Sequence, residues 1–216
     1  MRSEARDSAS PNATRYNEFV RVLFAVVLAI TAVACNPPAP DEGDYPGRIA
    51  AARAAKDEEF KRTNDPVPEA RKAALLPLEY YPIDPAFNVP AVLHPAPDAP
   101  TVRMITSTGS MEEHRVLGTL EFTVQGQTLK LTAFASAANR LFVPFQDQTS
   151  GTETYGAGRY IDLVRTGSNL YEIDFNNAYN PYCYYSLAYV CPLPPQENRL
   201  QVPIRAGEKI RPDAKS

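Results

Sequence analysis

The chain has 216 residues, a formal net charge of −3, and 21 prolines against 10 glycines. A nucleic-acid-binding surface needs clustered basic side chains, so this charge balance argues against a nucleic-acid partner. The many prolines argue against long helices and favour short strands and loops. The apolar fraction is normal for a globular protein, which excludes disorder of the whole chain.

The one long apolar run of the sequence, residues 22–34, is expected to belong to an export signal. It is too short to span a bilayer comfortably, since a span takes about 20 apolar residues. Arg21 precedes it and Ala34-Cys35 ends it, which is typical of the lipobox of bacterial lipoproteins. We therefore predict a signal peptide with a lipobox over residues 1–35, a lipid on Cys35, and an extracytoplasmic protein that the lipid anchors to the cell envelope membrane. The alternatives are an uncleaved anchor, simple secretion or a buried core segment.

A proline-rich and acidic stretch follows, and residues 36–47 are predicted to be an extended, solvated tether. Residues 48–62 are rich in alanine and other good helix formers, which predicts a helix. Ile49, Ala52 and Phe60 mark a thin apolar stripe, so we expect this helix to lie on the surface of the domain.

After the helix, the hydrophobic period changes to two, which predicts strands. The clearest element is a hairpin, in which residues 120–124 and 129–133 alternate about a turn at Gln125-Gly126. Further strands are expected at residues 87–93, 101–105, 141–143, 160–163 and 170–175. Residues 48–216 are therefore expected to form one mainly β domain: an antiparallel sandwich or partly open barrel, with an N-terminal flanking helix and a long Pro/Asn-rich loop near the C-terminus.

Residues 174–199 are the part of the chain richest in functional side chains. They combine side-chain amides, carboxylates, phenols, prolines and two cysteines. Asparagine amides satisfy backbone groups in irregular loops, so one interpretation is that these side chains hold up a long loop. The other is a polar pocket that grips a small ligand with amide donors and stacked phenols. On that interpretation, the candidate binding residues are Arg159, Asp174, Asn176, Asn177, Tyr179, Asn180, Glu197, Asn198 and Arg199.

Arg159 follows a glycine-containing turn, where the backbone could approach an anionic group. The favoured interpretation is a turn that leads into a strand, with the guanidinium paired to one of three nearby carboxylates. These are Asp147, Asp162 and Glu197.

The sequence contains no recognisable catalytic motif. Ser186 lacks the Gly-x-Ser-x-Gly pattern of hydrolase nucleophiles. His114 lies in a charged stretch and is expected to be solvated. A hydrolase-like enzyme that uses Arg159, Asp174 and Glu197 remains an alternative. A cluster of tyrosines would suit stacking against sugar rings or a protein partner, at positions Tyr179, Tyr182, Tyr184, Tyr185 and Tyr189.

With Cys35 acylated, Cys183 and Cys191 remain as a pair that an oxidising compartment would join. The loop between them is short, so the bridge would contribute about 2–3 kcal/mol through the unfolded state. The alternative is two buried free thiols. No metal site or cofactor is expected, because there is no Cys-x-x-Cys and both histidines, His94 and His114, are far away in sequence.

Several long stretches resemble a bacterial family catalogued as domain of unknown function 1684. They are residues 56–84, 145–160, 174–199 and 202–209. The likeness covers most of the chain after the tether, in a short form of the family without an additional β segment. The family carries no known activity, so the resemblance implies a shape and a region to examine. We expect a lipid-anchored, non-catalytic binding or envelope-structural module, whose ligand is a small molecule or an envelope component.

Overall fold

The structure is a computed structural model that describes residues 44–137 and 139–211. The predicted signal peptide, the lipobox at Cys35 and most of the predicted tether lie outside the described residues. The helical elements are α2 (Tyr45–Arg62), α3 (Glu69–Leu75) and α4 (Tyr182–Tyr185), with the short 3-10 turns η2 (Pro85–Phe87), η3 (Phe175–Asn177) and η4 (Gln196–Asn198). The strands are β1 (Asn88–Pro95), β2 (Thr101–Ile105), β3 (Met111–Val124), β4 (Gln127–Ser136), β5 (Arg140–Phe145), β6 (Arg159–Val164) and β7 (Leu170–Asp174).

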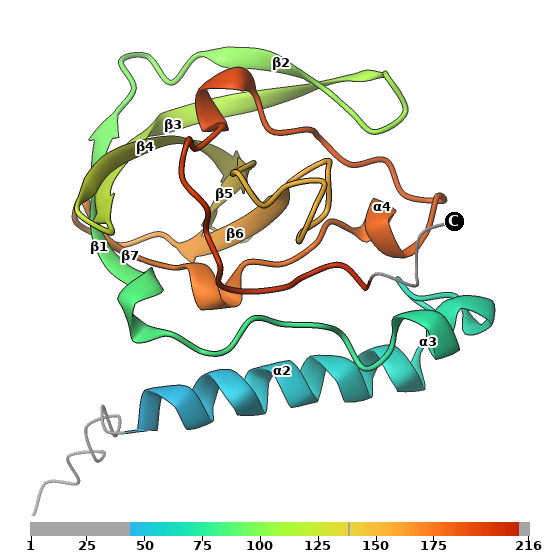
Figure 1. The fold of residues 1–216 in the computed structure, drawn as a ribbon. Coiled ribbons are helices and arrows are strands. Elements are labelled where there is room, and N and C mark those ends of the chain that lie inside the picture. The colour runs from blue at the N-terminus through green and yellow to red at the C-terminus, as the bar shows by residue number, and fades with distance from the viewer. Residues whose placement is uncertain (1–43, 138, 212–216) are drawn as a thin grey trace, which may run out of the picture. The chain divides into compact units, whose positions relative to one another are not determined.

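All strand pairs are antiparallel, in the order β6-β5-β4-β3-β1-β7, and β2 pairs with the first part of β3. The end strands β6 and β7 lie beside each other without pairing, so the sheet is nearly closed into a barrel (Figure 1). The expected mainly β fold is confirmed, and the barrel is the observed one of the two expected architectures.

The predicted hairpin forms the best-paired part of the sheet. Leu120 of β3 stands opposite Leu131 of β4, and both side chains are buried. Gln125 and Gly126 form the turn with φ values of 51° and 77°. Two positive φ angles at the centre of a two-residue loop give a turn whose twist matches that of the strands.

The C-terminal segment fills the barrel. Phe175, at the end of β7, packs with ring centroids 5.6 Å from Phe122 and 5.4 Å from Phe145. Residues 199–208 then cross the barrel without helices or strands (Figure 1), and their apolar side chains join the core. Because this segment forms few backbone ladder bonds, side chains must satisfy many of its polar backbone groups.

Helix α2 begins at Tyr45, three residues before the expected start at Arg48. The Asp44 carboxylate caps it by accepting a hydrogen bond from the backbone N–H of Gly47 at 3.2 Å, and Pro46 occupies the first turn. Both features favour a helix start. The tether composition therefore conceals the first turn of the helix.

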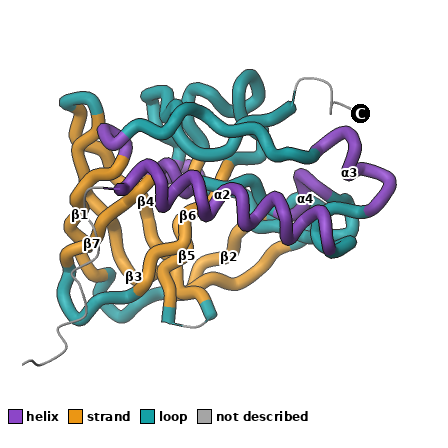
Figure 2. Tube along the Cα trace, turned by 90° about the horizontal axis from the view of Figure 1, so that it is seen from below, coloured by secondary structure: helices purple, strands orange, loops and turns teal. Residues whose placement is uncertain are grey.

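Helix α2 runs along the barrel domain (Figure 2), and polar contacts hold much of it there. Arg53 donates to the backbone carbonyls of Tyr81 at 2.9 Å and Asn176 at 3.0 Å, and Asp57 accepts from the backbone N–H of Leu78 at 2.8 Å. The expected apolar stripe is only partly correct, since two of its residues are buried and one is exposed. The buried residues are Ile49 and Phe60, and the exposed one is Ala52. Within residues 44–137 and 139–211, no helix has the length and apolar content to span a membrane.

Candidate functional site

Arg159 lies inside the barrel, and only 1% of the residue is exposed. Its guanidinium forms an ion pair with Asp147 at 2.9 Å and donates to the carbonyls of Ile204 at 2.8 Å, Glu208 at 3.2 Å and Ala206. Burial lowers the pKa of Arg159, and the charge of Asp147 opposes this shift. Arg159 therefore ties the C-terminal segment to β6, as in the favoured interpretation of the sequence, and takes Asp147 as its partner.

Asp174, Asn176 and Asn177 form a second structural cluster at the end of β7. The Asp174 carboxylate accepts hydrogen bonds from Asn176 Nδ2 at 3.0 Å, Asn177 Nδ2 at 2.8 Å and the Tyr45 hydroxyl at 2.8 Å. The Asn176 amide also bonds the backbone N–H and carbonyl of Asp84. These contacts join η3 to α2 and to the start of η2.

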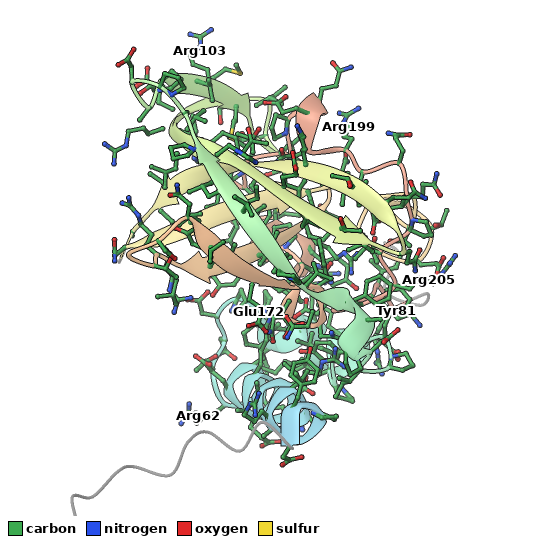
Figure 3. All side chains as sticks on the ribbon, turned by 90° about the vertical axis from the view of Figure 1, so that its left-hand side faces the viewer. Arg62, Tyr81, Arg103, Glu172, Arg199 and Arg205 are labelled. Atoms are coloured by element: carbon green, nitrogen blue, oxygen red, sulfur yellow. The ribbon has the colours of Figure 1, made fainter. Side chains whose placement is uncertain are left out.

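Asn198 is buried at a third place. Its amide accepts from the Thr132 N–H at 2.7 Å and donates to the carbonyls of Thr132 at 2.9 Å and Pro144 at 2.7 Å. Its neighbours Glu197 and Arg199 are exposed, and Arg199 projects outward (Figure 3). In the described parts of the chain, the hydrogen-bond partners of Asn198 are all different from those of Arg159 and Asp174.

The structure therefore does not bring the candidate residues into one site. Asp174 and Glu197, the pair considered for acid–base chemistry, have no contact in the described residues. Asn180 contacts the Glu208 carboxylate through its backbone N–H at 2.8 Å and the Lys209 carbonyl through its side chain at 3.1 Å. Most of the dense polar segment serves the fold.

A groove of about 770 Å³ lies beside this segment, between the end of α2, the β3–β6 region of the sheet and the loop around α4. Of the candidate residues, Tyr179 lines it. Much of its wall is aromatic and comes from distant parts of the chain: Phe60, His114, Phe142, Tyr160, Tyr179, Tyr182 and Tyr189. We call this cavity the tyrosine groove.

Edge-to-face contacts fix the aromatic rings of the tyrosine groove. The ring of Tyr160 lies 4.7 Å from that of Phe142 at 80° and 5.8 Å from that of Tyr179 at 90°. Tyr182 and Tyr189 pack at 5.2 Å and 73°. Rings held in this geometry present rigid faces and edges to a ligand.

His114 is not solvated as expected: its side chain is only 16% exposed. Its ring lies 6.0 Å from that of Phe142 and 6.1 Å from that of Phe134. Its Nε2 atom is buried without a hydrogen-bond partner among the described residues, and it lies 3.6 Å from Glu112 Oε2. Simple alternation along β3 does not reveal this position, because a bulge between Val116 and Gly118 puts His114 on the face opposite to that of Leu120.

Cys183 and Cys191 are buried next to each other as free thiols. The backbone N–H of Cys183 donates to Cys191 Sγ at 3.2 Å. A hydrogen bond with the Cys191 thiol lowers the pKa of Cys183 to about 7, against the effect of burial, and raises that of Cys191. The predicted bridge is therefore not formed in this structure, although its two residues are adjacent.

A second cavity of about 690 Å³ lies at Cys183, with Arg71 and Arg211 in its wall. Arg71 already donates to the carbonyls of Tyr184 at 3.2 Å and Tyr185 at 2.8 Å, so this guanidinium serves the fold. Across residues 44–137 and 139–211, no group of three or more His, Cys, Asp or Glu side chains is placed to hold a metal ion.

Residues 74–209 match the family described as "Protein of unknown function (DUF1684)". The chain belongs to the DUF1684 family. No curated protein matches it. It is similar to an uncharacterized protein from gene locus rrnAC0354 of Haloarcula marismortui, whose solution NMR structure is known. The two are 33% identical, with a TM-score of 0.61, and the match covers 79% of this chain and 96% of that chain.

The DUF1684 match begins at the end of α3 and contains the whole barrel and its C-terminal segment. The tyrosine groove combines this matched region with side chains from α2 and the loop after it, which precede the match. The family resemblance seen in the sequence is thus confirmed, and the family assigns no activity to the groove.

Proposed function

We propose that this DUF1684 protein is a non-catalytic binding module whose ligand site is the tyrosine groove. The observation that carries the proposal is a cavity of about 770 Å³ with rigid aromatic walls, beside a segment whose polar side chains mostly serve the fold. Small-molecule sites commonly measure about 300–1,000 Å³ and combine aromatic walls with a few polar groups.

The groove suits a ligand with a flat or compact apolar face. Its rings come from α2, β5, β6 and the α4 loop, so they surround a ligand from several sides. Polar contacts are available from the carboxylates of Glu112 and Asp162, and Asp162 already accepts from the Tyr179 hydroxyl at 2.7 Å. None of the contacts in the described residues favours the hydrolase alternative.

We expect ligand binding to depend on Tyr182. This side chain is 44% exposed, so the change Tyr182→Ala removes a groove wall with little effect on folding. An aromatic contact contributes about 0.5–1.5 kcal/mol beyond its buried area, so affinity should fall roughly two- to tenfold. A thermal-shift screen of the purified full-length protein against neutral saccharides, organic amines and short peptides identifies a ligand, and calorimetry measures the variant.

Val92→Ala is the matched control, because Val92 is 43% exposed on β1 and does not line the groove. It should retain the wild-type affinity. Equal affinity of Tyr182→Ala and the wild-type protein, or an equal loss in Val92→Ala, contradicts the groove as the ligand site.

We further propose that the module is exported, lipid-anchored at Cys35 and crosslinked between Cys183 and Cys191. The lipobox pattern and the adjacent buried thiols support this proposal. A thiol whose pKa is about 7 is partly ionised at neutral pH, which favours its oxidation to a disulfide in an oxidising compartment.

Cys35→Ala is expected to release the protein from membranes or to block its processing, because the acylated side chain is lost. Membrane fractionation and gel mobility measure this directly. Cys183→Ser is the control, since it leaves the acylation site intact and should remain in the membrane fraction. Unaltered fractionation and mobility of Cys35→Ala rule out the anchor.

A further inference from the structure

The tyrosine groove carries an excess of negative charge. Its wall contains one lysine, Lys56, whose ammonium is paired with the Glu208 carboxylate at 2.5 Å. The Glu208 side chain is only 2% exposed. Because the two charges are opposite and in contact, the pair adds no net charge to the groove. Four further carboxylates line the groove: Glu59, Asp65, Glu112 and Asp162. His114 adds a positive charge only when it is protonated.

These carboxylates act on the groove from opposite walls. Burial, followed by the negative charges of Asp65, Glu59 and Asp162, raises the pKa of the Tyr182 phenol. On the other side, burial raises the pKa of Tyr160, and the charge of Glu112 contributes to this shift. The aromatic rings therefore lie in a field that favours positive charge.

The same aromatic wall already holds an ammonium group of the protein. Lys56 Nζ lies 5.2 Å from the ring centroids of Phe60 and Tyr179, and 5.9 Å from that of Tyr185. These distances are within the range of about 6 Å at which a ring face attracts a cation. Phe142, Tyr160 and Tyr189 extend the aromatic lining beyond Lys56.

We infer that the ligand of the tyrosine groove carries an organic cation, such as a quaternary ammonium group. This inference rests on the proposed function of the groove as a ligand site. A neutral ligand of the same shape stacks on the rings but leaves the four carboxylates without a counter-charge. An anionic ligand, such as a phosphate, meets repulsion from those carboxylates.

The first test compares choline with 3,3-dimethylbutan-1-ol, its uncharged analogue of nearly equal shape, by calorimetry on the purified full-length protein. Choline is expected to bind at least tenfold more tightly, because cation–π attraction at a partly desolvated site is lost in the analogue. Equal affinities, or binding of a neutral saccharide but not of choline, contradict the inference that the ligand is a cation. Either result leaves the groove as a ligand site. If neither choline nor any compound of the functional screen binds, both the cationic ligand and the groove as a ligand site are wrong.

The second test removes charge without changing shape. The double variant Glu112→Gln with Asp65→Asn should weaken choline binding at least fivefold, and added salt should affect it less than the wild-type protein. Glu113→Gln is the matched control, since Glu113 is the exposed neighbour of Glu112 and points to the other face of β3. Thermal unfolding checks that the variants fold. Unchanged choline affinity in the double variant contradicts the inference.

Discussion

Replacing Arg159 with methionine is expected to lower the free energy of unfolding by about 3–5 kcal/mol, because it leaves a buried charge without its partner. The Asp147 side chain is fully buried and is paired with Arg159 at 2.9 Å. The carbonyls of Ile204 and Ala206 lose their donor in the same change. Urea denaturation followed by circular dichroism measures the loss.

An exposed arginine provides the control. Arg205 forms an ion pair with Glu153 at 2.8 Å, but 56% of its side chain is exposed. Solvent screens such a pair, so Arg205→Met should leave the urea midpoint nearly unchanged. Adding Asp147→Asn to Arg159→Met should recover part of the stability, since it removes the unpaired charge. Equal losses of stability in Arg159→Met and Arg205→Met contradict the claim that buried Arg159 holds the C-terminal segment to β6.

Glu208→Gln is expected to lower the free energy of unfolding by about 2–4 kcal/mol, because several buried donors lose a charged acceptor. Glu208 accepts from Lys56 Nζ, from the Asn180 N–H at 2.8 Å and from the Tyr185 hydroxyl at 2.5 Å. A glutamine presents an NH₂ group where one carboxylate oxygen accepts. Urea denaturation gives the loss, and hydrogen exchange should show faster exchange of the Asn180 amide.

Glu58→Gln is the matched control for Glu208→Gln. Glu58 pairs with Lys61 on the same helix as Lys56, but both side chains are largely exposed. It should unfold at nearly the wild-type urea concentration. Full stability of Glu208→Gln, or an equal effect of Glu58→Gln, shows that the buried carboxylate does not hold α2 and the C-terminal segment together.

The strands can be predicted from the sequence because the alternation of apolar and polar residues that marks them is a local pattern. The alternation around Gln125-Gly126 predicts the hairpin, and its turn residues adopt the backbone angles that such a turn needs. The start of α2 is less visible, because Asp44 and Pro46 read equally well as tether and as helix cap. Local composition cannot separate those two outcomes.

The site depends on contacts between residues that are far apart in the chain. Lys56 and Glu208 meet across 152 positions, and Arg159 reaches carbonyls more than 40 positions away. A polar side chain in a sequence does not reveal whether it faces a ligand or a backbone group. In the sequence, the tyrosines of the α4 loop stand out as a cluster. Glu112 and His114 are harder to assign to the groove wall, because the predicted strand begins at Leu120 whereas β3 begins at Met111.

The most direct test of the central claim is an NMR titration of the full-length protein, carrying ¹³C-labelled tyrosine, with the ligand found in the functional screen. The account predicts shifts for the ring signals of Tyr160, Tyr179, Tyr182 and Tyr189, and a fixed signal for Tyr171, which lies on β7 outside the groove. Fixed signals from the four groove tyrosines, with shifts at Tyr155 and Tyr184 of the second cavity, contradict the account.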